Sequence, residues 1–436
     1  MTLTGRTALL AAIGALPVGL LAPGRPGILA VEGILVLAIL CDLALAAPVR
    51  KLHFTRNGDT SVRLGDSADV HLVLTNPSGR RLRGWVRDAW PPSSWQAPEQ
   101  QGAARHRVSI APGERRRVVT RLIPARRGDH GAVRVTVRSY GPLGLAARQG
   151  SHHVPWTVRA LPSFESRRHL PSRLARLREL DGRTSVLSRG QGTEFDGLRE
   201  YVPGDDVRSI DWRATARQSA VAVRTWRPER DRQILVVLDT GRTSAGRVGG
   251  FPRLDASLDA TLLLAALASR AGDRVDLLAY DRRVRARVRR QNTADLLPAL
   301  MEALSTLEPE LVETDARGLA GAALQQAAPG ALIVLLTTLD AAPVEEALLP
   351  VLPLLTRRHT VLVAAVADPR VEEMERARGT VDAVYEAAAA GQTQAQRRRT
   401  AEQLRRRGVT VVDAPPARLA PALADAYLAL KAAGRL

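Results

Sequence analysis

Hydrophobic and polar positions follow three different patterns along this chain of 436 residues. Two nearly unbroken apolar runs come first, at about 7–22 and 28–47. From about 52 to 165, apolar and polar residues alternate in short runs between turn residues, as in "ADVHLVLTN", and this period of two is typical of an antiparallel β-sandwich. From 232 onward, continuous apolar runs such as "RQILVVLD" alternate with helical patterns. They predict buried parallel strands joined by helical crossovers.

These patterns predict an α/β protein with four segments. We expect a transmembrane hairpin over 1–51, a β-sandwich-like domain over 52–165, a helical connector with an unusual polar segment over 166–231, and a doubly wound, mostly parallel sheet domain over 232–436. Ligands of such a sheet gather at the carboxyl ends of its strands, where the winding reverses. Asp239, Asp340 and Asp368 follow predicted strands and are therefore candidates for a site.

The two N-terminal runs favour a membrane hairpin. The second run matches the roughly 20 residues needed to cross a bilayer, whereas the first is shorter and contains Pro17. A signal peptide would explain the first run, but the second follows at once and no small-residue cleavage site separates them. Arg6, Arg50 and Lys51 flank the hairpin, and Arg25 alone lies in its turn. Positive residues stay on the cytoplasmic side, which predicts a multi-pass protein of the cell membrane with cytoplasmic soluble domains.

Three polar or reactive residues interrupt the second apolar run. Glu32 and Asp42 either form a functional pair or lie close enough to the ends of the span for each carboxylate to reach the interface, and their positions favour the second reading. Cys41 is the only cysteine of the chain, so the sequence allows neither an intrachain disulfide nor a zinc site made of thiolates.

The formal net charge of +19 raises the question of an anionic partner. All but two of the 63 basic residues are arginine, and basic residues outnumber acidic ones most strongly in the β-rich segment. Few aromatic residues stand among these arginines, which argues against base stacking and so against nucleic acid. A basic domain just beyond a membrane span would instead be drawn to anionic lipid headgroups.

One segment, "EFDGLREYVPGDDVRSIDWRATARQS" at 194–219, concentrates carboxylates and aromatic side chains. Its "PGDD" predicts a turn followed by a helix start, which would direct Val207, Ile210 and Trp212 toward a core. Its acids have four natural partners in Arg199, Arg208, Arg213 and Arg217. Buried acids and guanidinium groups require such mutual neutralisation.

Two readings of this network stay open. In the first, it fastens the β-rich domain and the connector to the α/β sheet. In the second, it is a surface clamp for a partner protein. The clamp residues would be Glu194, Arg199, Asp205, Arg208, Asp211 and Arg217. Both can hold, because an interdomain joint couples binding to movement.

The same segment resembles a known family. "GTEFDGLREYVPGDDVRSIDWRATAR", together with the strand that ends in Asp239, is similar to the signature of the bacterial family called domain of unknown function fifty-eight. The residues that carry the match are Gly192, Glu194, Phe195, Leu198, Arg199, Tyr201, Gly204, Asp205, Arg208, Asp211, Trp212, Ala216 and Arg217. The resemblance implies a membrane-tethered protein with a β-domain and a von Willebrand factor A-like domain. It also implies a companion AAA+ ATPase of the MoxR kind.

Von Willebrand factor A domains often bind Mg²⁺ through a D-x-S-x-S loop with a threonine and an aspartate from later loops. Here Asp239 and Thr243 match that loop, but Gly241 replaces the first serine and offers no side-chain oxygen. Thr314 could be the later threonine, whereas Thr338 stands where the aspartate is usual, with Asp340 two residues on. Mg²⁺ requires near-octahedral oxygen ligands. We therefore expect a degenerate site without a cofactor, in which acids cap helix N-termini; Mg²⁺ is the one candidate ion.

These observations favour a binding protein over an enzyme. Neither lysine, Lys51 or Lys431, follows a glycine-rich phosphate loop, and no G-x-S-x-G elbow is present. Paired carboxylates of a glycosidase need set separations and a sugar platform, which the sequence does not show. We expect a membrane-anchored adaptor or scaffold that binds protein partners. The alternatives are a protein that binds anionic lipid at the membrane surface and, less favoured, an enzyme.

Overall fold

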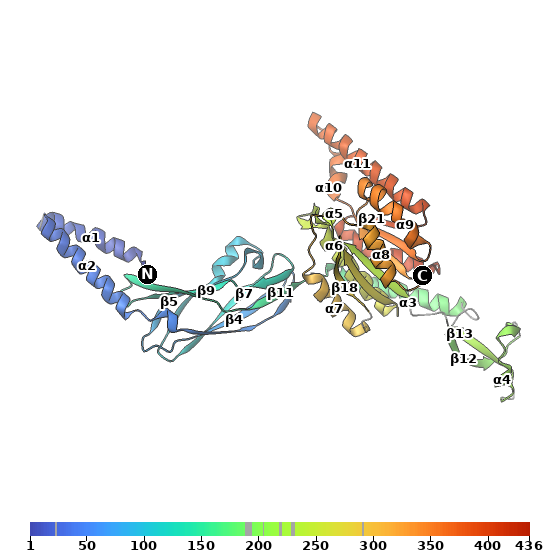
Figure 1. The fold of residues 1–436 in the computed structure, drawn as a ribbon, viewed down its shortest axis with the longest axis horizontal. Helices are drawn as coiled ribbons and strands as arrows, with labels where there is room; N and C mark the ends of the chain where they lie inside the picture. The colour runs from blue at the N-terminus through green and yellow to red at the C-terminus, as the bar shows by residue number, and fades with distance from the viewer. Residues whose placement is uncertain (22–23, 188–193, 204, 218–219, 228–231, 290–291) are drawn as a thin grey trace. The chain divides into compact units, whose positions relative to one another are not determined.

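The computed structural model describes residues 1–21, 24–187, 194–203, 205–217, 220–227, 232–289 and 292–436. The chain divides into two compact units, Met1–Ser163 and Phe164–Leu436. The first contains apolar helices and β-sheets, and the second contains a mixed α/β sheet (Figure 1). The predicted combination of a β-rich N-terminal region with an α/β region is confirmed.

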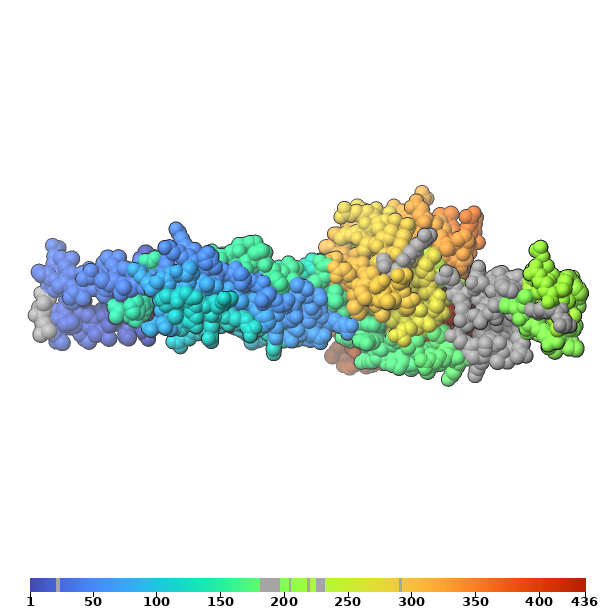
Figure 2. All heavy atoms as spheres, turned by 90° about the horizontal axis from the view of Figure 1, so that it is seen from below, coloured from blue at the N-terminus to red at the C-terminus, as the bar shows by residue number. Residues whose placement is uncertain are grey.

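Two apolar helices, α1 (Gly5–Leu21) and α2 (Arg25–Leu45), lie side by side at the start of the first unit (Figures 1 and 2). The candidate span Arg25–Lys51 has a mean hydropathy of 2.5 over its most apolar 18 residues, of which 6% are buried. It is the one segment among the described residues that is both long and apolar enough to cross a membrane. The helix α1 contains Pro17 and is shorter.

The β-rich part of the first unit consists of three sheets. The alternating sequence gives each strand one apolar face, which packs inward. The strand orders of the sheets are β1-β10-β9-β5-β6, β2-β4-β7 and β3-β11-β8. The strands are β1 (Thr2–Leu3), β2 (His53–Gly58), β3 (Ser61–Arg63), β4 (Ala68–Thr75), β5 (Leu82–Ala89), β6 (Arg105–Ile110), β7 (Arg115–Leu122), β8 (Gly128–Gly131), β9 (Arg134–Tyr140), β10 (Ala146–His152) and β11 (Thr157–Leu161). Inward residues such as Leu72, Val86 and Val137 form the core between the first two sheets.

Asp42, in the last turn of α2, binds that helix to the β-rich part. Its carboxylate accepts hydrogen bonds from the backbone N–H groups of Leu143, Leu145 and Ala146 at 2.7, 2.7 and 2.8 Å. From the other end of the helix pair, Thr7 donates its hydroxyl to the carbonyl of Leu145. The Asp42 carboxylate is fully buried against this loop. Its place at the membrane interface stays a prediction.

The second unit is built on a six-stranded sheet of order β18-β17-β14-β19-β20-β21. Five strands run parallel, and β18 pairs antiparallel with β17. The strands are β14 (Gln233–Asp239), β17 (Arg274–Tyr280), β18 (Val284–Val288), β19 (Leu332–Thr337), β20 (Thr360–Val366) and β21 (Thr410–Ala414). Every residue of β14 is buried, which agrees with its unbroken apolar sequence.

Helices cover both faces of this sheet. Apolar residues of α8 (Ala316–Gln326), α9 (Leu349–Thr356) and α11 (Val381–Arg406) share one core with the strands. The helices α6 (Arg253–Arg270) and α12 (Pro416–Ala432) pack together and on other strands. Further helical segments of this unit are η4 (Glu165–His169), α3 (Leu170–Leu187), α5 (Arg242–Ala245), α7 (Thr293–Ser305), the π-helix η6 (Pro343–Leu348) and α10 (Pro369–Arg376). A short hairpin, β15 (Arg247–Val248) and β16 (Phe251–Pro252), precedes α6.

Candidate functional site

The candidate site lies at the carboxyl ends of β14 and β19. From β14 the chain winds outward to β17 and β18, and then returns to the other side of β14 to form β19. The carboxyl ends of β14 and β19, at Asp239 and Thr337, therefore flank the point where the strand order reverses. Loops diverge at such a point and leave space for a ligand.

Asp239 is the centre of a hydroxyl-rich network at this edge. Its Oδ1 accepts hydrogen bonds from the backbone N–H of Gly241 at 2.9 Å and from the hydroxyl of Thr314. Its Oδ2 accepts the hydroxyl of Thr337 at 2.7 Å and that of Thr243 at 3.5 Å. With 6% of its surface exposed, Asp239 relies on these donors to offset the cost of burying its charge.

Gly241 has a steric role in this network. A Cβ atom at position 241 would collide with the hydroxyl of Thr314 and would lie 2.9 Å from the carbonyl oxygen of Val312. The backbone of Arg242 also donates a hydrogen bond to Val312, at 2.7 Å, so the two loops are held close together. The glycine in place of a serine thus allows Thr314 to reach Asp239.

A cavity of about 150 Å³ opens beside Asp239, and we call it the Asp239 pocket. Asp239, Thr243, Thr314 and Thr337 form its polar lining, and Leu319, Leu335, Val344 and Leu348 are prominent in its apolar lining. Three exposed charged residues complete the pocket: Glu313, Glu346 and Arg242. Arg242 pairs with Glu313 at 2.9 Å. Carboxylates outnumber guanidinium groups in this lining, so the pocket favours a cationic group next to apolar surface.

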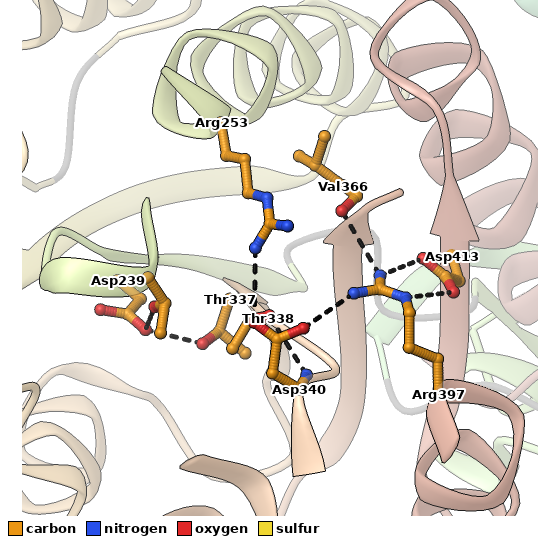
Figure 3. Close-up of polar contacts among 9 residues, drawn as sticks. Asp239, Arg253, Thr337, Thr338, Asp340, Val366, Arg397 and Asp413 are labelled. Atoms are coloured by element: carbon orange, nitrogen blue, oxygen red, sulfur yellow. Dashed lines mark hydrogen bonds and ion pairs between the residues drawn. The ribbon is translucent and has the colours of Figure 1, made fainter. Parts of the chain in front are cut away.

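Asp340 belongs to a different cluster (Figure 3). Its carboxylate pairs with Arg253 of α6 at 3.4 Å and with Arg397 of α11 at 3.1 Å, and Arg397 also pairs with Asp413 at 2.7 Å. Thr338 accepts the backbone N–H of Asp340 at 3.2 Å and does not contact Asp239. The structure therefore brings Asp239, Thr243 and Thr314 together, whereas Asp340 forms ion pairs with two arginines elsewhere.

This donor set differs from the Mg²⁺ site of the D-x-S-x-S pattern. Asp239 is the only carboxylate that the described residues place at the centre of the network, and its two oxygens already accept four hydrogen bonds. The second expected carboxylate, Asp340, is neutralised by arginines that would repel a cation. The described residues likewise contain no cluster of three His, Cys, Asp or Glu side chains that could hold a metal.

Asp368, the third strand-end acid, caps a helix. Its Oδ1 accepts the backbone N–H of Arg370 at the start of α10, at 3.0 Å. The guanidinium of Arg370 pairs with it at 2.7 Å. The hydrogen bond from the Arg370 side chain is the main reason why the pKa of Asp368 is lowered. This arrangement is the acid-capped helix start that the sequence led us to consider.

The signature segment forms a small module of its own, residues 194–227, which we call the signature module. Its strands β12 (Glu194–Glu200) and β13 (Ala222–Arg227) pair antiparallel, and η5 (Val207–Ser209) and α4 (Trp212–Thr215) lie between them in the chain. Gly192 and Gly204 lie outside the described residues, as do the side chains of Glu194 and Phe195.

The ion pairs of this module are internal. Arg199 pairs with Asp205 at 2.5 Å, and Arg224 pairs with Asp211 at 2.8 Å. Asp211 also accepts the backbone N–H groups of residues 213 and 214 at the start of α4. The backbone hydrogen bond from Ala214, followed by the Arg224 side chain, lowers the pKa of Asp211. The expectation that these ion pairs fasten the β-rich domain and the connector to the α/β sheet is therefore wrong for the described residues.

Two other expectations for the module also need correction. Arg208, Arg213 and Arg217 form no ion pair within the described part of the chain, although the sequence marked them as partners of the acids. Trp212 and Val207 do not face a core, because 67% and 62% of their surfaces are exposed. Tyr201 is half-buried. The module thus presents apolar side chains outward, which is typical of a contact surface.

A comparison with protein-family models identifies the family of the second unit. Residues 197–412 match the family model described as "Protein of unknown function DUF58". These residues are a DUF58 domain. The match includes most of the signature module and the sheet as far as β21, and it confirms the resemblance inferred from the sequence.

A relative of this DUF58 protein is "Uncharacterized protein YeaD" of Bacillus subtilis (strain 168), which is 24% identical over 195 residues. The match covers 44% of this chain and 48% of YeaD, so it spans about half the length of that relative.

Two solved structures are similar to parts of this chain. The SpRpn10 VWA domain is 13% identical and has a TM-score of 0.26, and the match covers 46% of this chain and 94% of that domain. The CARDB domain of the PF1109 protein from Pyrococcus furiosus, solved with di-metal ions, is 13% identical, has a TM-score of 0.18, and shares 28% of this chain and 92% of that domain. Scores this low carry no argument about function.

Sequence reasoning missed two residues of these sites. Thr337 was passed over because the family pattern aligned Thr338 with the usual aspartate, whereas the alternation of side chains along β19 directs Thr337 to Asp239. Arg224 was missed because it reaches Asp211 only through the isolated bridge between Ile210 and Val223, which brings the segment before α4 beside β13.

Proposed function

We propose that this protein is a membrane-anchored, cytoplasm-facing adaptor whose DUF58 domain binds a partner protein through the Asp239 pocket and the signature module. In this proposal the domain is a doubly wound, von Willebrand factor A-like recognition module. The family resemblance points to a MoxR-type AAA+ ATPase as the partner. The Asp239 pocket is the observation that carries the proposal.

The size and chemistry of the pocket support a protein partner. Small-molecule sites usually enclose about 300–1,000 Å³, and a cavity of about 150 Å³ fits a single amino-acid side chain better. Its carboxylates and apolar wall suit the aliphatic stem and cationic end of a lysine or arginine. The pocket would therefore receive a basic side chain from the partner, and no metal-dependent step is part of the proposal.

The lining of the pocket also argues against catalysis. Within the described part of the chain, it contains no serine, cysteine, histidine or lysine that could serve as a nucleophile or general base. Its one buried carboxylate, Asp239, already accepts four hydrogen bonds. A base so saturated with donors is poorly placed to abstract a proton.

The N-terminal helices support the membrane anchor. Apolar side chains such as Leu16, Leu20, Leu29 and Leu37 are exposed on α1 and α2, as expected of lipid-facing positions. Both ends of the helix pair contact the loop at 141–147. A helix pair with both ends at one loop supports the proposed hairpin, and its flanking basic residues favour the cytoplasmic side.

Co-purification from native membranes tests this proposal. The chain with Glu346→Lys reverses one charge of the pocket, and Glu345→Lys makes the same change on the neighbouring exposed residue outside the lining. In the presence of nucleotide, we expect the wild type and Glu345→Lys to recover an AAA+ ATPase, and Glu346→Lys to recover about tenfold less. Recovery of no AAA+ protein by the wild type, or equal loss in both variants, would contradict the proposal.

A further inference from the structure

The outer face of the sheet β1-β10-β9-β5-β6 carries a field of arginines. In the strand register, Arg107, Trp85, Arg138 and Gln149 lie in one row across the sheet. The next row contains Arg105, Arg87, Thr136 and Ser151. The sequence alone does not predict that these arginines share one face, because they come from different strands and only the strand register aligns them.

Arg87 and Arg105 lie directly opposite each other on β5 and β6. Like charges in this position destabilise a sheet, because the side chains stand only about 5 Å apart. No carboxylate among the described residues pairs with either guanidinium. This contrasts with the other two sheets of the same unit, where Arg121 pairs with Asp69 at 2.8 Å and Arg159 with Asp129 at 2.6 Å.

A groove of about 780 Å³ follows this face, and we call it the arginine groove. Four arginines line it: Arg87, Arg105, Arg134 and Arg138. Among the described residues, its lining contains no aspartate or glutamate. Trp85 is 44% exposed among them. Neutral hydrogen-bonding side chains, including Gln149 and Thr136, complete the lining. Its size and its uncompensated positive charge suit an extended anionic ligand.

The position of the groove argues against lipid. The membrane helices bind the loop that follows Tyr140, at one end of β9. Arg134 lies at the other end of that strand, about 20 Å away at the rise of an extended chain. A headgroup layer at the helix ends would leave the Arg134 end of the groove beyond its reach.

The side chains also favour a polypeptide over nucleic acid. Binding of single strands relies on several aromatic rings that stack on successive bases. In the groove, Trp85 is exposed, whereas Trp90 is 7% exposed and donates its ring N–H to the buried Asp88. Guanidinium groups interspersed with amides and hydroxyls match the carboxylates and main-chain amides of an acidic peptide.

We propose that the arginine groove of the first unit is a binding site for an acidic, extended segment of a partner protein. The like-charged pair of Arg87 and Arg105 is retained for this ligand, whose carboxylates neutralise it on binding. This site lies outside the DUF58 domain, and the inference does not depend on the proposed role of the Asp239 pocket.

Binding of poly-L-glutamate to the full chain in phosphatidylcholine nanodiscs tests the site, with change in tryptophan fluorescence as the readout. The test variant is Arg87→Ala with Arg105→Ala. The control is Arg115→Ala with Arg117→Ala, which removes the same charge from exposed positions of β7 on another sheet. We expect about tenfold weaker binding for the test pair, and nearly unchanged binding for the control pair because distant charges are screened.

A stability measurement separates a ligand site from a structural role. The thermal midpoint of the test pair should equal or exceed that of the wild type, because the substitutions remove a repulsion. Parallel titrations use oligothymidylate and phosphatidylserine vesicles. Equal loss in both arginine pairs, a lower midpoint for the test pair, or tighter binding of either parallel probe than of poly-L-glutamate would overturn the inference.

Discussion

The carboxylate of Asp42, inside the apolar sequence of α2, accepts the backbone N–H of Leu145 in the β-rich part at 2.7 Å. A buried acid that satisfies several backbone donors is a strong tether, because each donor would otherwise be left unpaired. The helix pair and the β-rich part are therefore joined through fixed hydrogen bonds. In the proposed anchored adaptor, such a joint would set the orientation of the first soluble part with respect to the helices.

Asp42→Ala tests this joint. The substitution leaves three backbone N–H groups without their acceptor, and we expect a loss of about 2–4 kcal/mol in the stability of the first unit. Thermal unfolding of the full chain in nanodiscs measures it. Glu32→Gln, on the exposed side of the same helix, is the control and should change the midpoint little. Equal midpoints for Asp42→Ala and the wild type would contradict the account.

Gly241→Ser would restore the missing serine of the D-x-S-x-S loop but should not restore a metal site. Its Cβ would collide with the hydroxyl of Thr314 and crowd Val312, so we expect a loss of about 1–3 kcal/mol. Calorimetric titration of the variant with Mg²⁺ should show no gain in binding over the wild type. Tight Mg²⁺ binding by Gly241→Ser without loss of stability would show that the site needed only the missing oxygen.

His106 predicts a pH dependence of the first unit. Burial lowers the pKa of its imidazole below the ordinary value of 6.5, although the charge of Asp88 acts in the opposite direction. The unfolded chain therefore takes up the proton at a higher pH than the folded chain does. Stability should fall as the pH drops below about 6.5 and level off below the folded pKa. Unfolding midpoints across this range should depend less on pH in His106→Gln.

Asp259 predicts the opposite behaviour in the second unit. Burial raises the pKa of its carboxyl group, while hydrogen bonds from Ser166 to its Oδ1, at 3.1 and 3.0 Å, partly oppose the shift. The folded chain thus holds this proton more tightly, and its contribution to stability is lost as the pH rises through the folded pKa. Asp259→Asn keeps an acceptor oxygen and removes the buried charge, so it should raise the unfolding midpoint at neutral pH. A lower midpoint would show that the charge of Asp259 itself stabilises its contact with Ser166.

Trp212 tests the contact surface of the signature module. Trp212→Ala removes a ring that is 67% exposed, so stability should change by less than about 0.5 kcal/mol. Recovery of the partner should nevertheless fall several-fold, because exposed tryptophans are frequent hot spots of interfaces. Tyr385→Ala removes an aromatic ring of similar exposure from α11 and is the control. Equal recovery by both variants and the wild type would exclude Trp212 from the interface.

The sequence predicted elements whose residues carry their own signal. The unbroken apolar run of β14 has few alternatives to a buried strand, and the alternation in β4 and β7 places their inward residues correctly. Contacts that depend on the register between strands could not be predicted from the sequence. Thr337 belongs to its site because a neighbouring strand brings it there, and Arg87 meets Arg105 for the same reason. Arg224 meets Asp211 through the bridge between Ile210 and Val223. Asp340 was assigned to the wrong cluster because Arg253 and Arg397 reach it from distant helices.

Photocrosslinking from the Asp239 pocket in living cells tests the central claim most directly. A photoreactive residue at position 347, in the lining of the pocket, is compared with one at the exposed position 270, beyond the opposite end of the sheet. The account predicts that position 347 crosslinks to an AAA+ ATPase, that Glu346→Lys abolishes the adduct, and that position 270 gives none. The absence of any protein adduct at 347, or the same adduct from both positions, would contradict it.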